Sequence, residues 1–220
     1  MTTSTVPPGP ELPSARRARV AVVTGGTSLV AAEVAERLRQ LGLDVVFLDN
    51  EAGTAAVGAA LAGVAATRGR PGVLVDVVRA SAEQQLCAMS DEQWAAATGD
   101  PLRAFFAAAR PTADLMSESG WGRIVAVAPP PSCGAEHAVL RAGLEGFVRT
   151  IALELEPYGV TANLIAPRRP RVGLGAGHLT DASSDDTARY ARAVSDAVAG
   201  LLGADAVTGQ VVYVSTDAAD

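Results

Sequence analysis

Lysine is absent from this 220-residue chain, in which all 18 basic residues are arginine and 24 acidic residues give a formal net charge of −6. Proteins that bind nucleic acid without sequence preference need clustered cations to contact phosphates. The acidic balance therefore argues against a nucleic-acid partner. Arg168, Arg169 and Arg171 form the only tight basic cluster after the N-terminal segment, and we expect them to lie in a solvated loop.

Cysteine is scarce, and long apolar runs are missing from the N-terminal segment. Cys87 and Cys133 lie far apart without the spacing of metal ligands, so neither a disulfide framework nor a metal site is predicted. Residues 1–18 are rich in Pro, Ser and Thr, which predicts a disordered tail rather than a signal peptide or membrane anchor. We expect a cytoplasmic protein with one domain over residues 19–220.

The apolar residues that are present, 49% of the chain, suffice for one buried core. An apolar run at 20–24 ends at a glycine pair, and the following segment repeats apolar residues at helical spacing. A second apolar run at 45–48 ends at Asp49. This order of strand, glycine turn, helix and strand predicts a βαβ unit.

The same alternation continues to the end of the chain. We expect helices over 51–70, from Ser90 to about Ser119, over 135–155 and around 190–201, and strands near 73–75, 124–128, 160–166 and 211–214. Gln93 stands at the capping-box position relative to Ser90. Strands that alternate with helices predict a doubly wound α/β domain with a mostly parallel sheet covered on both faces.

Several phrases resemble the short-chain dehydrogenase/reductase superfamily, and β-ketoacyl-acyl-carrier-protein reductases in particular. They are Val-Val-Thr-Gly-Gly at 22–26, Met-Ser-Asp-Glu-Gln-Trp at 89–94, Gly-Arg-Ile-Val at 122–125, Arg-Ala-Gly-Leu-Glu-Gly-Phe at 141–147, Tyr-Gly-Val-Thr-Ala-Asn at 158–163 and Val-Thr-Gly-Gln-Val at 207–211. The resemblance implies a Rossmann-type domain. Between Asp49 and Val73 the chain is shorter than the family norm by roughly one strand and one helix, so we expect one edge strand to be missing.

The positions that would hold a nicotinamide cofactor depart from the family pattern. Thr-Gly-x-x-x-Gly-x-Gly is the family turn, whereas Leu29 and Ala31 replace its second and third glycines here. The resemblance assigns NAD(H) or NADP(H) contacts to Gly25, Gly26, Ser28 and Asp49. Asp49 lies where a ribose-binding acid would favour NAD, although it is equally an ordinary loop residue. We expect no cofactor to bind.

The catalytic positions depart further. The family relay uses Tyr, Lys, Ser and Asn, and the flanking phrases place His137 and Arg141 at the Tyr and Lys positions. Pro129 and Pro101 stand at the Ser and Asn positions, and Ser132 lies close enough in sequence to supply the lost hydroxyl if the loop shifts. His137 is either a general acid/base or a polar residue at the start of a helix.

Three hypotheses follow. The first is a catalytically degenerate, non-catalytic subunit that partners an active related reductase or another biosynthetic enzyme. We expect a homo- or hetero-oligomer that forms through helices 102–119 and 135–155, where family members commonly assemble. The apolar stripe of the second helix could equally be ordinary core. The alternative is an enzyme, either an atypical ketoreductase or a cofactor-free isomerase, cyclase or dehydratase that uses His137 under a lid at 168–185. A ligand-sensing regulatory protein has the least support.

Overall fold

The computed structural model describes residues 20–81, 84–129, 134–167 and 184–215. Six strands form one sheet in the order β2-β1-β3-β4-β5-β6, and every pair of neighbours is parallel. The strands are β1 (Val20–Thr24), β2 (Asp44–Phe47), β3 (Pro71–Val77), β4 (Gly122–Val127), β5 (Val160–Pro167) and β6 (Val211–Val214). The predicted parallel α/β sheet is confirmed.

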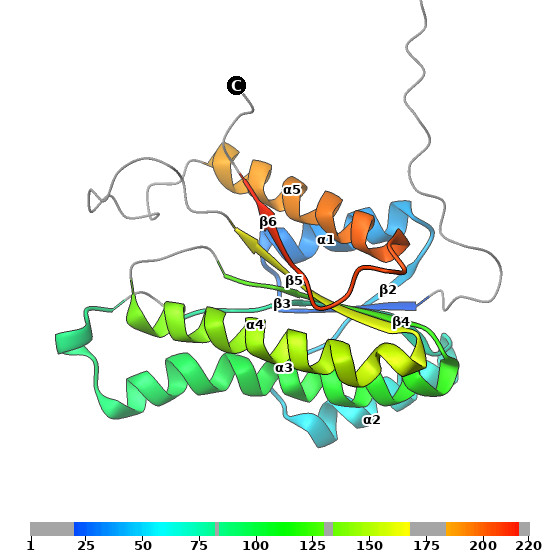
Figure 1. The fold of residues 1–220 in the computed structure, drawn as a ribbon, viewed down its shortest axis with the longest axis horizontal. Coiled ribbons are helices and arrows are strands. Elements are labelled where there is room, and N and C mark those ends of the chain that lie inside the picture. Colours follow the sequence, from blue (N-terminus) through cyan, green and yellow to red (C-terminus); the bar gives the residue numbers. More distant parts are fainter. Residues whose placement is uncertain (1–19, 82–83, 130–133, 168–183, 216–220) are drawn as a thin grey trace, which may run out of the picture.

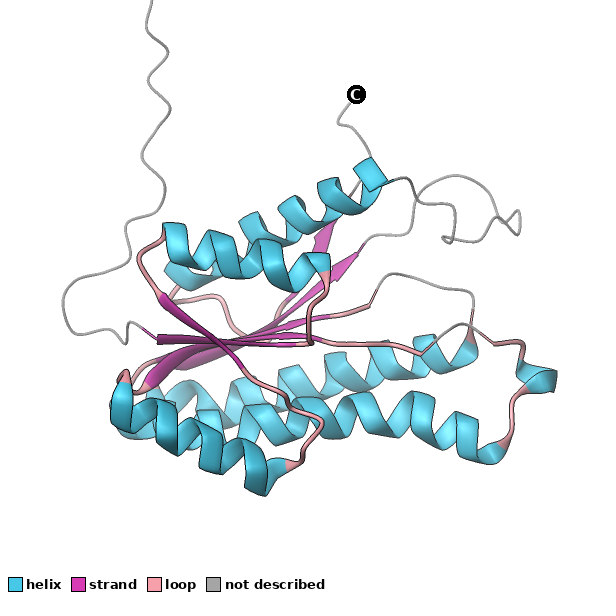
Figure 2. Ribbon diagram, turned by 180° about the vertical axis from the view of Figure 1, so that it is seen from behind, coloured by secondary structure: helices cyan, strands magenta, loops and turns pink. Residues whose placement is uncertain are grey.

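Helices cover both faces of the sheet (Figures 1 and 2). On one face lie α1 (Leu29–Gln40) and α5 (Ser184–Gly203), and on the other lie α2 (Thr54–Thr67), α3 (Asp91–Ser119) and α4 (Ala135–Leu155). The short 3-10 turns η1 (Leu86–Ala88) and η2 (Glu156–Tyr158) connect elements. Each face buries its own apolar cluster against the sheet. The sheet is therefore buried on both sides, as parallel sheets require.

The expected boundaries agree closely with the observed ones at the strongest local signals. Residues 135–155 and 211–214 form a helix and a strand with the predicted bounds. Ser90 and Gln93 form the predicted capping box, since Gln93 N donates to Ser90 Oγ at 3.2 Å and Ser90 N donates to Gln93 Oε1 at 2.8 Å. The helix expected over 51–70 is shorter, because Gly53 has a positive φ of 85° and ends the preceding turn.

The sheet edge at β2 bears out the predicted loss of one strand. A single helix, α2, joins β2 to β3, and β2 pairs only with β1 among the described strands. The chain runs from β1 outward to β2 and then crosses back to β3 on the other side of β1. The direction of winding therefore reverses between β1 and β3, which is where doubly wound folds bind their ligands, beyond the carboxyl ends of the strands.

A buried carboxylate ties three strand ends together at this point. Asp76, near the end of β3, is 1% exposed. Its Oδ1 accepts hydrogen bonds from the hydroxyl of Thr24 at the end of β1 and from Nδ2 of Asn50, at 2.8 Å, just after β2. Burial, only partly offset by these two hydrogen bonds, raises the pKa of Asp76 to about 6.

The glycine turn after β1 packs against the same strand end. Gly25 has a φ of +96°, and a Cβ at this position would collide with the carbonyl oxygen of Val77 and lie 2.8 Å from the Val77 side chain. Gly26 also has a positive φ, but a Cβ there would meet nothing closer than Arg79 Nη1, at 3.8 Å. Close approach of two backbone segments therefore requires glycine at 25 and not at 26.

We expect Gly25→Ala to lower the free energy of unfolding by about 3 kcal/mol or more, because it adds a steric clash to an unfavourable φ. Gly26→Ala has only the backbone strain, about 1 kcal/mol. Denaturant titration of both purified variants measures the difference. Equal losses in the two variants would show that contact with Val77 is not what requires the glycine.

The raised pKa of Asp76 also leads us to expect that the stability of the fold depends on pH. Because its pKa is higher in the folded state, at about 6, than the ordinary 3.8, the carboxyl stabilises the fold below about pH 4 and this contribution is lost as the pH rises through about 6. In Asp76→Asn the amide oxygen accepts the same two hydrogen bonds without a charge. Relative to this variant, the wild type should lose about 2 kcal/mol of unfolding free energy between pH 4 and pH 7.

The measurement is a series of denaturant titrations at stepped pH. Asp114→Asn, an exposed substitution on α3, serves as the matched control and should keep the wild-type pH dependence. If Asp76→Asn also keeps it, Asp76 is not the group that titrates.

Candidate functional site

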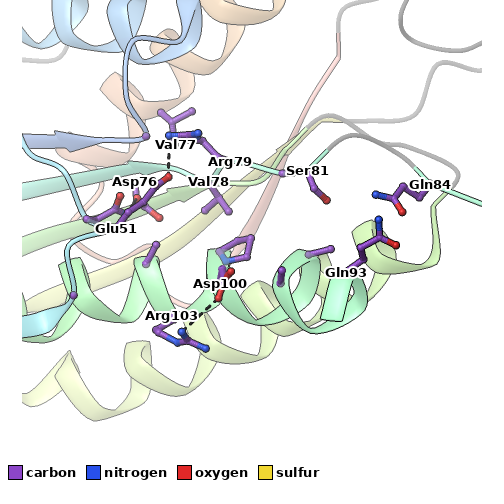
Figure 3. Close-up of a pocket in the computed structure, with 18 residues that line it drawn as sticks. Glu51, Asp76, Val77, Val78, Arg79, Ser81, Gln84, Gln93, Asp100 and Arg103 are labelled. Atoms are coloured by element: carbon purple, nitrogen blue, oxygen red, sulfur yellow. Dashed lines mark hydrogen bonds and ion pairs between the residues drawn. The ribbon is translucent and has the colours of Figure 1, made fainter. Parts of the chain in front are cut away.

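A cavity of about 620 Å³ opens at the carboxyl ends of β1, β2 and β3 (Figure 3). Its sheet side is formed by the strand ends and the loops that follow them, and its opposite wall is formed by α3. The lining residues are Gly25, Asn50, Glu51, Gly53, Asp76, Val77, Val78, Arg79, Ala80, Ser81, Gln84, Gln93, Ala96, Ala97, Asp100, Pro101, Arg103 and Ala104. Its size and its place beyond the strand ends are those of a small-molecule site.

Two ion pairs lie on the wall of this cavity. Arg79 Nη1 is 2.8 Å from Glu51 Oε1, and Arg79 reaches over the glycine turn beside Gly26. On α3, Arg103 Nη1 is 3.4 Å from Asp100 Oδ1. Each arginine of the lining is thus engaged by a carboxylate. Asp76 receives only the two neutral hydrogen bonds described above.

Of the four residues assigned to a cofactor, Gly25 is the one that lines the cavity. Ser28 instead caps α1 by accepting a hydrogen bond from Ala31 N at 3.2 Å. Asp49 is exposed, and its Oδ1 accepts a local hydrogen bond from Glu51 N at 2.9 Å. Its neighbour Asn50, which the sequence did not single out, is the buried residue that lines the cavity.

The turn where phosphates would approach carries an apolar side chain. Leu29 is the first residue of α1 and is 49% exposed. Ala31, which replaces the last family glycine, is fully buried in the core. The sequence alone indicated both substitutions, and the structure shows that one projects outward while the other packs inward.

His137 and Arg141 lie one turn apart on α4. His137 Nε2 is 3.0 Å from the carbonyl oxygen of Ser81. Arg141 Nη1 donates to the Pro167 carbonyl at 3.3 Å, and its guanidinium lies 5.4 Å from the centre of the Tyr213 ring. Arg141 therefore connects α4 to the ends of β5 and β6.

Two buried groups near these residues were missed by the sequence. Glu136 is 1% exposed and accepts a long hydrogen bond from Gln84 N at 3.4 Å, and among the described residues its Oε2 has no hydrogen-bond partner. Tyr190 donates to the Ala128 carbonyl at 3.4 Å. Burial raises the pKa of Tyr190, while the nearby charge of Arg141 lowers it. No motif marks either residue, because their partners are remote in sequence.

The remaining catalytic positions carry no reactive group in the described chain. Pro129 is buried just after β4, and Pro101 lies inside α3 on the cavity wall. Four predictions concern residues outside the described ranges: Ser132, the basic cluster at 168–171, most of the expected lid at 168–185 and the predicted tail at 1–18.

Residues 20–81, 84–129, 134–167 and 184–215 contain no cluster of three metal-ligating side chains. In these same ranges no helix is long and apolar enough to cross a membrane.

Comparisons with known proteins agree with the observed fold. A family model described as enoyl-(acyl carrier protein) reductase matches residues 14–216. Short-chain reductase protein NovJ of Streptomyces niveus is 32% identical over 67% of this chain and 68% of its own length. From the same organism, short-chain dehydrogenase/reductase family member NovK is 30% identical over 91% of this chain and 96% of its own.

A more distant relative is the 3-oxoacyl-acyl-carrier-protein reductase FabG of Escherichia coli, 24% identical over 91% of both proteins. The crystal structure of gox2181 superposes with a TM-score of 0.76 over 91% of this chain and 95% of that chain. At 22% identity this likeness concerns the fold alone. From the family match and the two Streptomyces relatives, the chain belongs to the short-chain dehydrogenase/reductase superfamily, and it resembles the ketoacyl-acyl-carrier-protein reductases within it.

Proposed function

We propose that this protein is a non-catalytic subunit that pairs with an active, related reductase. The observation that carries the proposal is a row of exposed apolar and small residues on the outer face of α4, with Phe106 of α3 beside it, in a chain where every position of the family relay is altered. The Glu145–Arg149 ion pair, at 2.8 Å, borders this row. Proline at 129 and 101 offers no hydroxyl or amide group. Arg141 is bonded to Pro167 and stacked on Tyr213, and a guanidinium differs from an ammonium in shape and in its permanent charge.

The cavity also fits a nicotinamide cofactor poorly, which supports the same proposal. Leu29 projects at the turn where a pyrophosphate would need bare backbone amides. The Arg79–Glu51 pair lies beside that turn. The nearby carboxylate of Asp76 faces a site that would have to accept phosphates. We therefore derive no hydride-transfer step for this chain.

The outer face of α4 has the composition of a helix contact. Val139 and Leu153 are 45% and 73% exposed, and Ala142, Gly146 and Thr150 lie exposed between them. A Cβ at Gly146 would have no atom within 4 Å. On α3, Phe106 is 43% exposed and stacks on Phe147 with ring centres 6.4 Å apart. The large apolar side chains of Val139, Leu153 and Phe106 therefore lie around the small residues in the middle of α4.

These positions are symmetric about Gly146. Val139 and Leu153 lie seven residues before and after it, and Ala142 and Thr150 lie four residues before and after it. An antiparallel helix of the same kind would therefore place large residues against large ones and small against small, with Gly146 at the crossing. In the proposed pair, the related reductase supplies this second helix, because it shares the same fold. The two relatives in Streptomyces niveus are an example of one organism with two such proteins.

A second candidate function is a cofactor-free enzyme that uses His137. The buried carboxyl of Glu136 on the same helix favours this candidate, because its Oε2 has no hydrogen-bond partner among the described residues. The bond from His137 Nε2 to the Ser81 carbonyl favours the structural role instead. The exposed free thiol of Cys87 supports a reducing, cytoplasmic setting for either function.

We expect no saturable binding of NADH or NADPH up to about 1 mM, the upper end of ordinary substrate constants. The reason is the obstructed turn at Leu29 and the carboxylate-rich cavity. Fluorescence titration of the purified chain measures this, with the active reductase partner as the positive control. Micromolar binding would contradict the proposal. Carbonyl reduction by the chain alone, abolished by His137→Ala, would favour the enzymatic candidate.

We expect co-expression with a related active reductase to give one complex on size exclusion. We expect Gly146→Leu to raise the dissociation constant of this complex at least tenfold, which corresponds to about 1.4 kcal/mol. A leucine would separate two helices that cross at Gly146. Gly200→Leu is the matched control, because Gly200 is also an exposed helical glycine with no atom within 4 Å of its Cβ position.

Both substitutions raise helix propensity equally, so only the location differs. Loss of the complex in Gly146→Leu alone supports the pairing. A chain that stays a monomer, or forms only a homodimer, when the partner is present would overturn the proposal.

A further inference from the structure

We propose that the cavity at the ends of β1, β2 and β3 binds a small organic ligand through a protonated amino group, held by Asp76. This site is separate from the outer face of α3 and α4 and involves no nicotinamide chemistry. The inference rests on the arrangement of charges around the cavity, on the contacts of Asp76 and on the shape of the opposite wall (Figure 3).

Charge pairing around the cavity leaves one carboxylate without a cation. Three acids line it, namely Glu51, Asp76 and Asp100. Arg79 pairs with Glu51, and Arg103 pairs with Asp100. Asp76 is the most buried of the three acids, and its described partners are the neutral side chains of Thr24 and Asn50. A desolvated carboxylate is costly unless a cation compensates it.

One carboxylate oxygen of Asp76 is left available to a ligand in the cavity. Both hydrogen bonds that it receives end on Oδ1. Oδ2 accepts no hydrogen bond from the described residues, although Asp76 is 1% exposed and lines the cavity. Asn50 donates its Nδ2 to Asp76, so its amide oxygen is the neighbouring acceptor. A donor-only group such as an ammonium matches two adjacent acceptors.

The opposite wall is suited to an apolar ligand body. The cavity side of α3 carries Ala96, Ala97, Pro101 and Ala104. These short side chains leave the 620 Å³ that falls in the range of about 300–1,000 Å³ for small-molecule sites. The same wall also carries Gln93 and the Arg103–Asp100 ion pair, so the four apolar residues form a patch within it, and this patch and Asp76 orient an amphiphilic amine. An anion would meet the Asp76 carboxylate instead and would be disfavoured.

The test compares three probes of similar shape on the full-length protein by NMR titration: phenethylamine as a cation, 2-phenylethanol as a neutral donor and 3-phenylpropionate as an anion. We expect phenethylamine to bind at least tenfold more tightly than the other two, a difference of about 1.4 kcal/mol. Equal binding of the three probes, or no binding of phenethylamine, would overturn the inference.

Two variants locate the binding. Asp76→Asn keeps the hydrogen bonds of the strand ends and should weaken phenethylamine binding by at least tenfold, whereas the exposed Asp114→Asn should leave it unchanged. Ala96→Trp fills the cavity from an exposed position of α3 and should also abolish binding, so the test stands even if Asp76→Asn folds poorly. Wild-type affinity in both cavity variants would place the amine elsewhere. Complex formation with a reductase is scored separately, so each proposal can fail alone.

Discussion

The buried carboxylate of Asp76 is the constraint around which the functional edge of this sheet is organised. β2 is a four-residue edge strand that pairs on one side only among the described strands. The hydrogen bond from Asn50 to Asp76 holds the loop that follows β2, and the bond from Thr24 holds the end of β1. The cavity is bounded by these same three segments. Its shape therefore depends on an acid whose ionisation is opposed by burial, so the group that orders the site also weakens the fold at neutral pH.

The residues that replace the family's functional residues make packing, capping or hydrogen-bond contacts in this structure. Ala31 replaces a glycine and is fully buried in α1, where alanine is the better helix former. Ser28 caps that helix. Arg141 replaces a lysine and joins α4 to the carbonyl of Pro167 and the ring of Tyr213. Each change is consistent with the local structure around it, which explains how the fold is retained when the residues of the relay are not.

Local patterns in the sequence were enough to predict most elements. The bounds of α4, the strand at 211–214 and the capping box at Ser90 follow from periodicity and from contacts within a few residues. The site was predicted less well, because Asn50 and Thr24 are 26 and 52 residues from Asp76 in the chain. Their meeting depends on strand order. A shift of one residue also mattered, since β2 ends at Phe47 and the buried polar residue that follows is Asn50 rather than Asp49.

The helix α3 belongs to both proposed binding surfaces, and this limits how they can influence each other. Pro101 and Ala104 line the cavity, while Phe106 lies on the outer face a few residues later. A ligand changes pairing only if it binds differently to two arrangements of the helix. Proline at 101 removes one backbone hydrogen bond of the helix at the level of the cavity, while the capping box holds its first turn. Any coupling between ligand and partner through α3 therefore acts on a helix whose backbone hydrogen bonding is interrupted at Pro101 and again at Pro111.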